Sequence, residues 1–283
     1  LNDNNNVTPV NPNHPLTSGG FLTNGGYSDD YIATSLSTTF RMAPYTWNFK
    51  WENRNGKVED KMGVSTNFIR EISQGIIFST THEYFASEFI NGATGQLLRG
   101  DFSLAYRPET SRYSLLNRLK YRHEEVDNIS NTPIFGQTTL QGLNNQASSA
   151  LINNFNLNYL SMNEKNQYSL YLGTKYALDR YDGKNYSSIL NLLGVESRHT
   201  LFNEHWDIGF QGFILNSLNL GNFKYSLGPS IGYSPLENFW ISLGYNFAGF
   251  NDRDFDAAQY TQNGIYLKLR IKFDEKSLGI KKK

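Results

Sequence analysis

The chain has 283 residues, a formal net charge of zero, no cysteine and a mean hydropathy of −0.52. No stretch approaches the roughly 18 apolar residues that a membrane helix needs, so a bundle of transmembrane helices is excluded. A net charge of zero gives no indication of nucleic-acid binding. The absence of cysteine excludes disulfides and thiolate chemistry. A 14% share of aromatic residues, with 24 glycines, indicates a β-rich protein with many turns.

Residues 1–29 are mainly Asn, Pro, Gly, Ser and Thr without a hydrophobic period, so we expect a flexible linker or a lumen plug. The chain opens at Leu1 without the basic start and apolar core of a signal peptide, which suggests a mature product or a piece of a longer chain. Residues 276–283 form a basic C-terminal tail. The region between them, residues 30–275, is expected to form one domain.

Runs of roughly ten to fourteen residues alternate with turns through this domain, as expected for a series of β-strands. We expect strands at 31–42, 45–54, 60–72, 75–89, 96–107, 113–127, 147–161, 167–180, 186–200, 205–217, 223–233, 239–251 and 263–274.

The last run shows the alternation most clearly, because Ile265, Leu267 and Leu269 share one face while Tyr266 and Lys268 share the other. A purely apolar face opposite a cationic face fits a strand between lipid and a wet interior. The runs from residue 167 onward repeat the pattern. We therefore predict an all-β fold, a transmembrane antiparallel β-barrel in the bacterial outer membrane. In this register, Leu243→Arg should block insertion and Ser242→Arg should be tolerated.

Thirteen runs conflict with the even strand number of a closed antiparallel barrel. We favour fourteen strands over twelve, with the additional strand hidden in residues 16–28. The connections, which include 43–44, 73–74 and 162–165, predict short periplasmic turns, and the stretches 127–146 and 251–262 predict longer external loops. Aromatic residues beside the short turns predict an interfacial girdle. Its members are Tyr45, Trp47, Tyr113, Tyr168, Trp206, Phe239 and Trp240.

Charged residues fall on the face opposite the apolar one, where they would line the lumen. These are Arg99, Asp101, Arg118, Lys120, Arg122, Lys175, Glu196, Arg198, Lys268 and Arg270. They could make a pore selective for anions, but we favour a lumen in which these charges form ion pairs or which the N-terminal segment fills.

Two segments resemble a known family. Ala105 to Tyr121 is similar to the "AYRP, short turn, LN-x-L-x-KY" hairpin of C-terminal barrel domains in large bacterial surface proteins, and Leu243 to Phe255 with Tyr260 to Glu275 resembles their closing hairpin. The resemblance covers roughly residues 97–275. It implies an outer-membrane barrel that anchors, or helps export, attached β-sandwich repeats.

The terminal strand could also supply a barrel-insertion signal, because assembly machinery pairs with an exposed edge strand. Its candidate residues are Gly264, Tyr266, Leu269, Ile271 and Phe273. The expected partners are the lipid bilayer and lipopolysaccharide, the barrel-assembly machinery, and an attached surface or periplasmic protein.

Little in the sequence points to catalysis. No two of the five histidines have a metal-ligand spacing, and we expect no cofactor and no enzyme activity. Asp252, Asp254 and Asp256 could hold a calcium ion, although a solvated loop is favoured. The first hypothesis is a membrane anchor and the second a porin-like channel. The third is a hydrolase in the barrel wall that would use His123 beside Glu124 and Glu125.

Overall fold

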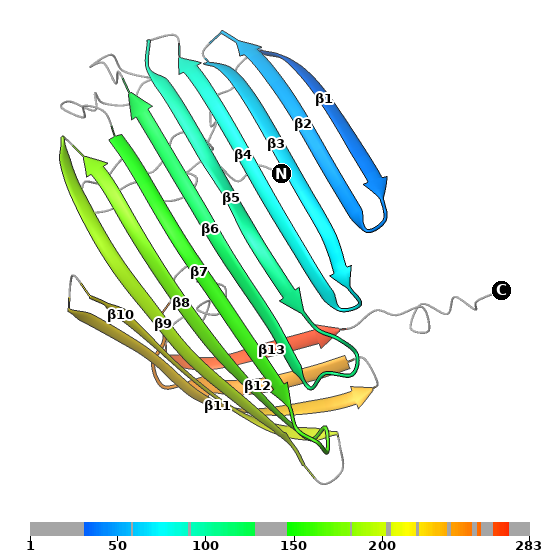
Figure 1. The fold of residues 1–283 in the computed structure, drawn as a ribbon. Coiled ribbons are helices and arrows are strands. Elements are labelled where there is room, and N and C mark those ends of the chain that lie inside the picture. Colours follow the sequence, from blue (N-terminus) through cyan, green and yellow to red (C-terminus); the bar gives the residue numbers. More distant parts are fainter. Residues whose placement is uncertain are drawn as a thin grey trace. The chain divides into compact units, whose positions relative to one another are not determined.

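A computed structural model of the chain describes residues 31–57, 59–89, 92–127, 146–181, 183–201, 205–218, 221–236, 239–250, 254–255 and 263–271. These residues include no helix that is long and apolar enough to cross a membrane. They form thirteen strands (Figure 1). The strands are β1 (Tyr31–Met42), β2 (Tyr45–Gly56), β3 (Glu59–Ser73), β4 (Ile76–Phe89), β5 (Thr94–Tyr106), β6 (Tyr113–Asp127), β7 (Gln146–Leu160), β8 (Asn166–Tyr181), β9 (Lys184–Thr200), β10 (Trp206–Ser217), β11 (Asn222–Leu236), β12 (Phe239–Asn246) and β13 (Gly264–Ile271).

The strands form one sheet whose spatial order is the order of the sequence, from β1 to β13. The pairings with an assigned register, β1 to β5 and β9 to β13, are all antiparallel. The prediction of an all-β antiparallel sheet is confirmed, and each of the thirteen expected runs corresponds to one strand. Residues 16–28, where a fourteenth strand was expected, lie outside the described residues, as do the predicted linker and the C-terminal tail.

The prediction that short and long connections alternate is wrong. The connection at Ala43 and Pro44 is short, as expected. Four connections that were expected to be long also span only two to four residues between strand ends: 57–58, 90–93, 182–183 and 218–221. Several flanking strands extend beyond the predicted runs; β2, for example, continues to Gly56. Only the connections 128–145 and 247–263 are long.

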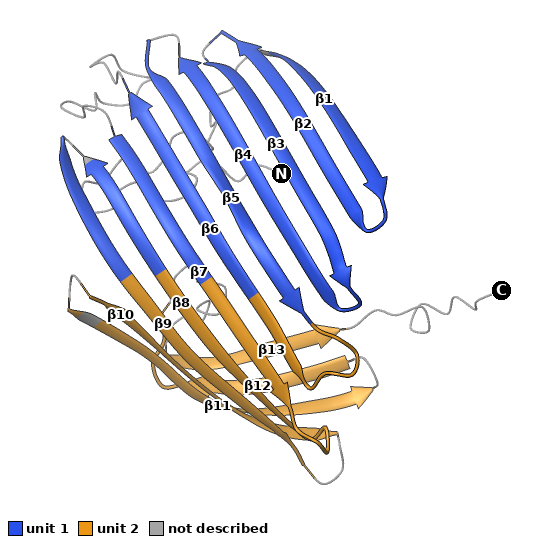
Figure 2. Cartoon of the chain, viewed as in Figure 1, with its two compact units in different colours: residues 1–106, 117–153, 175–189 blue, residues 107–116, 154–174, 190–283 orange. Residues whose placement is uncertain are grey.

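The chain divides into two compact units (Figure 2). Unit 1 holds β1 to β5 together with 117–153 and 175–189, and unit 2 holds 107–116, 154–174 and 190–283. The boundary therefore crosses β6, β7, β8 and β9, and each unit is described by itself below.

In unit 1, β1 shows the two faces of the sheet. Ile32, Leu36 and Phe40 are 76%, 66% and 55% exposed. The intervening positions are small and polar, and Ser37 pairs with Lys50 of β2. On this polar face a small hydrophobic cluster is built from Leu97 and Val126, with Phe85 and Phe89 packed against it.

In unit 2 the alternation predicted from the sequence is present in β10 to β13. Ile208, Phe210 and Ile214 of β10 are exposed, whereas Asp207, Gln211 and Phe213 are buried. In β13 the four residues of the apolar face, Ile265, Leu267, Leu269 and Ile271, are at least 54% exposed. Among the described residues, each unit thus presents an apolar face with exposed side chains and a polar face that carries the buried side chains. We call these the apolar face and the polar face.

Candidate functional site

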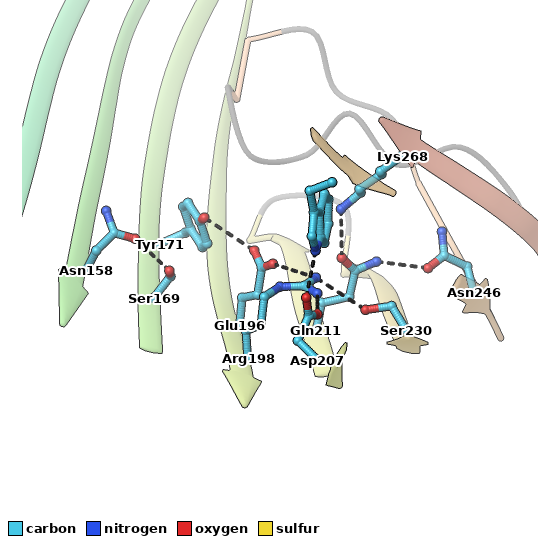
Figure 3. A network of polar contacts seen from close by, with 11 residues as sticks. Asn158, Ser169, Tyr171, Glu196, Arg198, Asp207, Gln211, Ser230, Asn246 and Lys268 are labelled. Atoms are coloured by element: carbon cyan, nitrogen blue, oxygen red, sulfur yellow. Dashed lines mark hydrogen bonds and ion pairs between the residues drawn. The ribbon is translucent and has the colours of Figure 1, made fainter. Parts of the chain in front are cut away.

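The polar face of unit 2 carries a connected network of charged and amide side chains (Figure 3). Its centre is Arg198 of β9, Asp207 of β10 and Trp240 of β12. Register places Arg198 opposite Gly209, two residues from Asp207, on adjacent strands. Because alternate residues of a strand share a face, these side chains reach one another across the sheet.

Asp207 is the acceptor that joins the network. One of its carboxylate oxygens, Oδ1, forms an ion pair with Arg198, and the other, Oδ2, accepts a hydrogen bond of 2.6 Å from Trp240 Nε1. Arg198 also donates to Ser230 Oγ over 3.4 Å and lies 3.9 Å from a carboxylate oxygen of Glu196. A guanidinium is well suited to this role, since its planar fork can serve several acceptors at once.

Two glycines make room for this arrangement. A Cβ atom at Gly232 would lie 2.4 Å from Asp207 Oδ1 and 2.6 Å from Trp240 Nε1. A Cβ atom at Gly209 would lie 2.6 Å from Ser230 Oγ and 2.9 Å from an Arg198 nitrogen. A larger residue at either position would displace the polar groups, so the glycines are part of the site.

Cations from β13 extend the network. Lys268 Nζ donates to Gln211 Oε1 over 3.4 Å, and Gln211 Nε2 donates to Asn246 Oδ1 over 3.0 Å. The guanidinium of Arg270 lies 5.0 Å from the centre of the Trp240 ring, and that of Arg198 lies 4.5 Å from it. The indole therefore contacts two cations, a favourable cation–π arrangement.

The network contains no activated nucleophile and is close to charge balance. Its cations are Arg198, Lys268 and Arg270, and its anions are Glu196 and Asp207, which leaves one positive charge. Paired and hydrogen-bonded groups of this kind hold strands in register more readily than they bind a free ion. Glu196, Arg198, Lys268 and Arg270 were predicted as lumen charges, whereas Asp207 was not among the predicted site residues.

Residues 254 and 255, in the connection after β12, also pack on the polar face of unit 2. Phe255 is completely buried, and a Cβ atom at Gly173 of β8 would lie 2.5 Å from its ring. Asn154 of β7 donates to the backbone oxygen of Asp254 over 3.2 Å. Asp254 thus belongs to a segment packed on β7 and β8, and Asp252 and Asp256 lie outside the described residues. No hydrophobic period in this part of the sequence indicates that Phe255 is a core residue.

In unit 1 the predicted lumen charges also lie on the polar face. Arg118 of β6 donates to Asp101 of β5 over 3.1 Å, and Arg99 forms an ion pair with Glu83 of β4. Strand alternation places three further predicted lumen charges on the same faces of their strands: Lys120, Arg122 and Lys175.

The candidate insertion residues of β13 divide between the two faces. Leu269 and Ile271 are exposed on the apolar face. Tyr266 lies on the polar face, where its ring fills the space above Gly244, and Gly264 adopts a φ of 145° at the strand start. Phe273 lies outside the described residues. Their role in insertion stays a prediction.

The predicted girdle residues lie beside connections at one end of the strands. In unit 2, Tyr159 lies between Tyr113 and Tyr168, with ring centres 4.9 and 6.3 Å away, and Trp206 packs on Tyr233 at 4.5 Å. Phe239 is half-buried on the same face as Trp206. In unit 1, Tyr45 packs on Phe68 at 6.0 Å, and Trp47 is 49% exposed.

Trp240 does not fit the girdle and is a correction to the prediction. It follows Phe239 directly in β12, so strand alternation turns its indole to the polar face, where it donates to Asp207. Trp240 was predicted to join the girdle because it lies beside a turn, but nearness to a turn does not indicate the face of the sheet on which a side chain lies.

No family model and no curated protein matches this chain. Among solved structures, the chain is similar to the siderophore receptor PirA from Pseudomonas aeruginosa, with 8% identity, a TM-score of 0.59, and coverage of 77% of this chain and 39% of the receptor. The siderophore receptor PirA from Acinetobacter baumannii gives 9% identity, a TM-score of 0.54, and coverage of 77% and 40%. BamA from Haemophilus ducreyi aligns at 10% identity over 77% of this chain and 57% of that structure, with a TM-score of 0.34, which carries no argument.

These similarities show the fold. Over 77% of its length the chain shares the fold of the two receptors, and it spans about two fifths of their length.

Proposed function

We propose that this chain is a bacterial outer-membrane β-barrel protein that anchors an attached surface or periplasmic assembly. The observation that carries the membrane role is the apolar face, where strand after strand exposes Leu, Ile, Phe and Tyr without protein cover. Soluble monomers rarely expose contiguous apolar surface of this extent, and lipid is the solvent that would cover it. The fold shared with outer-membrane receptors supports the same location.

An anchor, rather than a channel, is supported by the polar face. Arg198 and Asp207 have side chains only 18% and 11% exposed and are paired with each other, and Arg118 is paired with Asp101. Selective pores present charges to passing ions, whereas these charges are satisfied by protein partners. The same charges in unpaired form would support an anion channel instead.

Fractionation of cells tests the membrane role. The chain, carrying a signal peptide and a tagged soluble domain fused before Leu1, should place the tag in the outer-membrane fraction. The tag should stay there after a wash with high salt and alkaline carbonate, which releases peripheral proteins. Recovery of the folded tag in the soluble periplasm would overturn the proposal.

Planar-bilayer recording tests the anchor against the channel. The purified chain should give no steady conductance, and neutralising Lys268 should leave the trace unchanged. Stable open channels whose anion preference falls in Lys268→Gln would favour the channel instead. The barrel-assembly machinery is the expected partner in insertion, and its depletion should leave the chain protease-sensitive in the periplasm.

A further inference from the structure

Three polar side chains meet on the apolar face of unit 1, in adjacent strands β6 and β7. His123 Nδ1 lies 2.8 Å from Ser149 Oγ. Its other ring nitrogen, Nε2, lies 3.6 Å from Glu125 Oε2. The imidazole is therefore placed between a hydroxyl and a carboxylate, and each of its nitrogens has one partner.

Strand alternation fixes the face on which this group lies. Arg118 pairs with Asp101 on the polar face, so the odd-numbered residues of β6, including His123 and Glu125, point to the opposite side. In β7, Ser149 shares its face with Leu151, which is 49% exposed. The group thus lies on the surface that would contact lipid.

The height of the group along the strands is also informative. His123 is the eleventh of the fifteen residues of β6. With a rise of about 3.3 Å per residue and a tilt of about 40°, ten residues climb about 25 Å, the height of the apolar band in such proteins. His123 and Ser149 therefore lie at the boundary between acyl chains and headgroups, if the proposed membrane location holds.

Arg180 of β8 holds the carboxylate in place. It forms an ion pair with Glu125, and it lies on the same face as the exposed Leu178. The side chains of His123 and Glu125 are 40% and 25% exposed, so a ligand that lies on the sheet can reach the imidazole. A buried structural histidine would be closed to such a ligand.

We propose that Ser149, His123 and Glu125 form a hydrolytic site for the acyl esters of membrane lipids. Ser149 is the nucleophile and His123 the general base. Glu125, whose Oε2 lies 3.6 Å from His123 Nε2, is a positioning residue that stabilises the imidazolium. The substrate class follows from the position of the site, because lipid ester carbonyls lie where acyl chains meet headgroups.

The reaction uses water alone as co-reactant. Ser149 Oγ forms a bond to the ester carbonyl carbon as its proton passes to His123 Nδ1. The ester C–O bond then breaks, and the leaving alkoxide takes that proton and departs as an alcohol. Water attacks the acyl-serine and gives a proton to His123, which returns it to Ser149 Oγ as the fatty acid leaves.

The test uses the full chain in vesicles of phosphatidylethanolamine and phosphatidylglycerol, with fatty-acid release as the readout. A second assay uses the soluble ester p-nitrophenyl butyrate. Ser149→Ala and His123→Ala should each lower both rates by at least about 100-fold. Ser148→Ala removes the neighbouring hydroxyl on the polar face and should leave the rates unchanged. A fluorophosphonate probe should label the wild type and not Ser149→Ala.

The test of Glu125 must separate a positioning role in the reaction from a contribution to the stability of the fold. Glu125→Gln should lose much of the rate, because its uncharged amide cannot stabilise the imidazolium, and Glu125→Asp should recover part of it, because it keeps the charge. Equal loss in both variants would refute the positioning role.

The failures of this site and of the membrane role are distinguishable. A wild-type chain that floats with vesicles yet hydrolyses neither ester refutes the site and leaves the anchor standing. Rates that survive Ser149→Ala also refute it. Hydrolysis of the soluble ester alone, by a chain that does not float, refutes the lipid substrate together with the membrane role.

Discussion

Arginine substitutions along β1 give a quantitative test of the apolar face. Leu36 is 66% exposed and lies at the middle of the twelve-residue strand, while Met42 is its last residue. The six steps from Leu36 to Met42 climb about 15 Å at a rise of about 3.3 Å per residue and a tilt of about 40°. Leu36 is therefore expected near the bilayer midplane and Met42 near its surface.

Arginine on the lipid side costs about 2–4 kcal/mol at the midplane and about 0–1 kcal/mol near the interface. Leu36→Arg should thus lower the free energy of unfolding by about 2–4 kcal/mol, and Met42→Arg by at most about 1 kcal/mol. Ser37→Arg is the matched control, since Ser37 is exposed on the polar face opposite Lys50. It should change the free energy of unfolding little.

Reversible urea unfolding in phospholipid vesicles, followed by tryptophan fluorescence, measures these differences. Equal losses in Leu36→Arg and Ser37→Arg would show that the faces are assigned wrongly. Equal losses in Leu36→Arg and Met42→Arg would show that the apolar band is not centred on the strand.

The same unfolding assay serves three further predictions. Phe255→Ala leaves a cavity at a completely buried side chain and should lower the free energy of unfolding by about 3–5 kcal/mol. A loss below about 1 kcal/mol would mean that Phe255 does not pack on the sheet. Gly194→Ala puts a Cβ atom 2.2 Å from the Phe213 ring and should cost about 1–3 kcal/mol, recovered in part by adding Phe213→Leu; no recovery would refute the contact. Asp207→Asn removes the charge facing a mostly buried guanidinium and should cost about 3 kcal/mol, against at most about 1 for Glu52→Gln in an exposed pair; equal costs would count against the network.

The period-two alternation carried most of what could be predicted from the sequence. Lipid and polar surroundings select opposite residue types at successive positions, so the faces of β10 to β13 could be read directly. The strand ends were less predictable, and several strands extend beyond the expected runs. Ser242 shows the limit of the pattern. Alternation placed it on the polar face, and Ser242→Arg was expected to be tolerated, but the residue is 1% exposed and leaves no space for arginine.

Contacts between distant segments could not be predicted. Ser149 follows a long connection whose length says nothing of which strand position it will meet, so its contact with His123 depended on the register of β6 and β7. Phe255 lies in a segment without a period and packs on strands about eighty residues earlier in the chain. Alternation fixes a face, but the partner on that face depends on register and on loop packing.

The sequential strand order has a consequence for how such a sheet can change. Each strand pairs with the strand beside it in the sequence, so a hairpin depends only on its two flanking strands. Duplicating or deleting one hairpin changes the partners of the two flanking strands alone and preserves the alternation of direction. Sheets of this kind can therefore widen or narrow in steps of two strands, and loop closure within each hairpin stays short at every size.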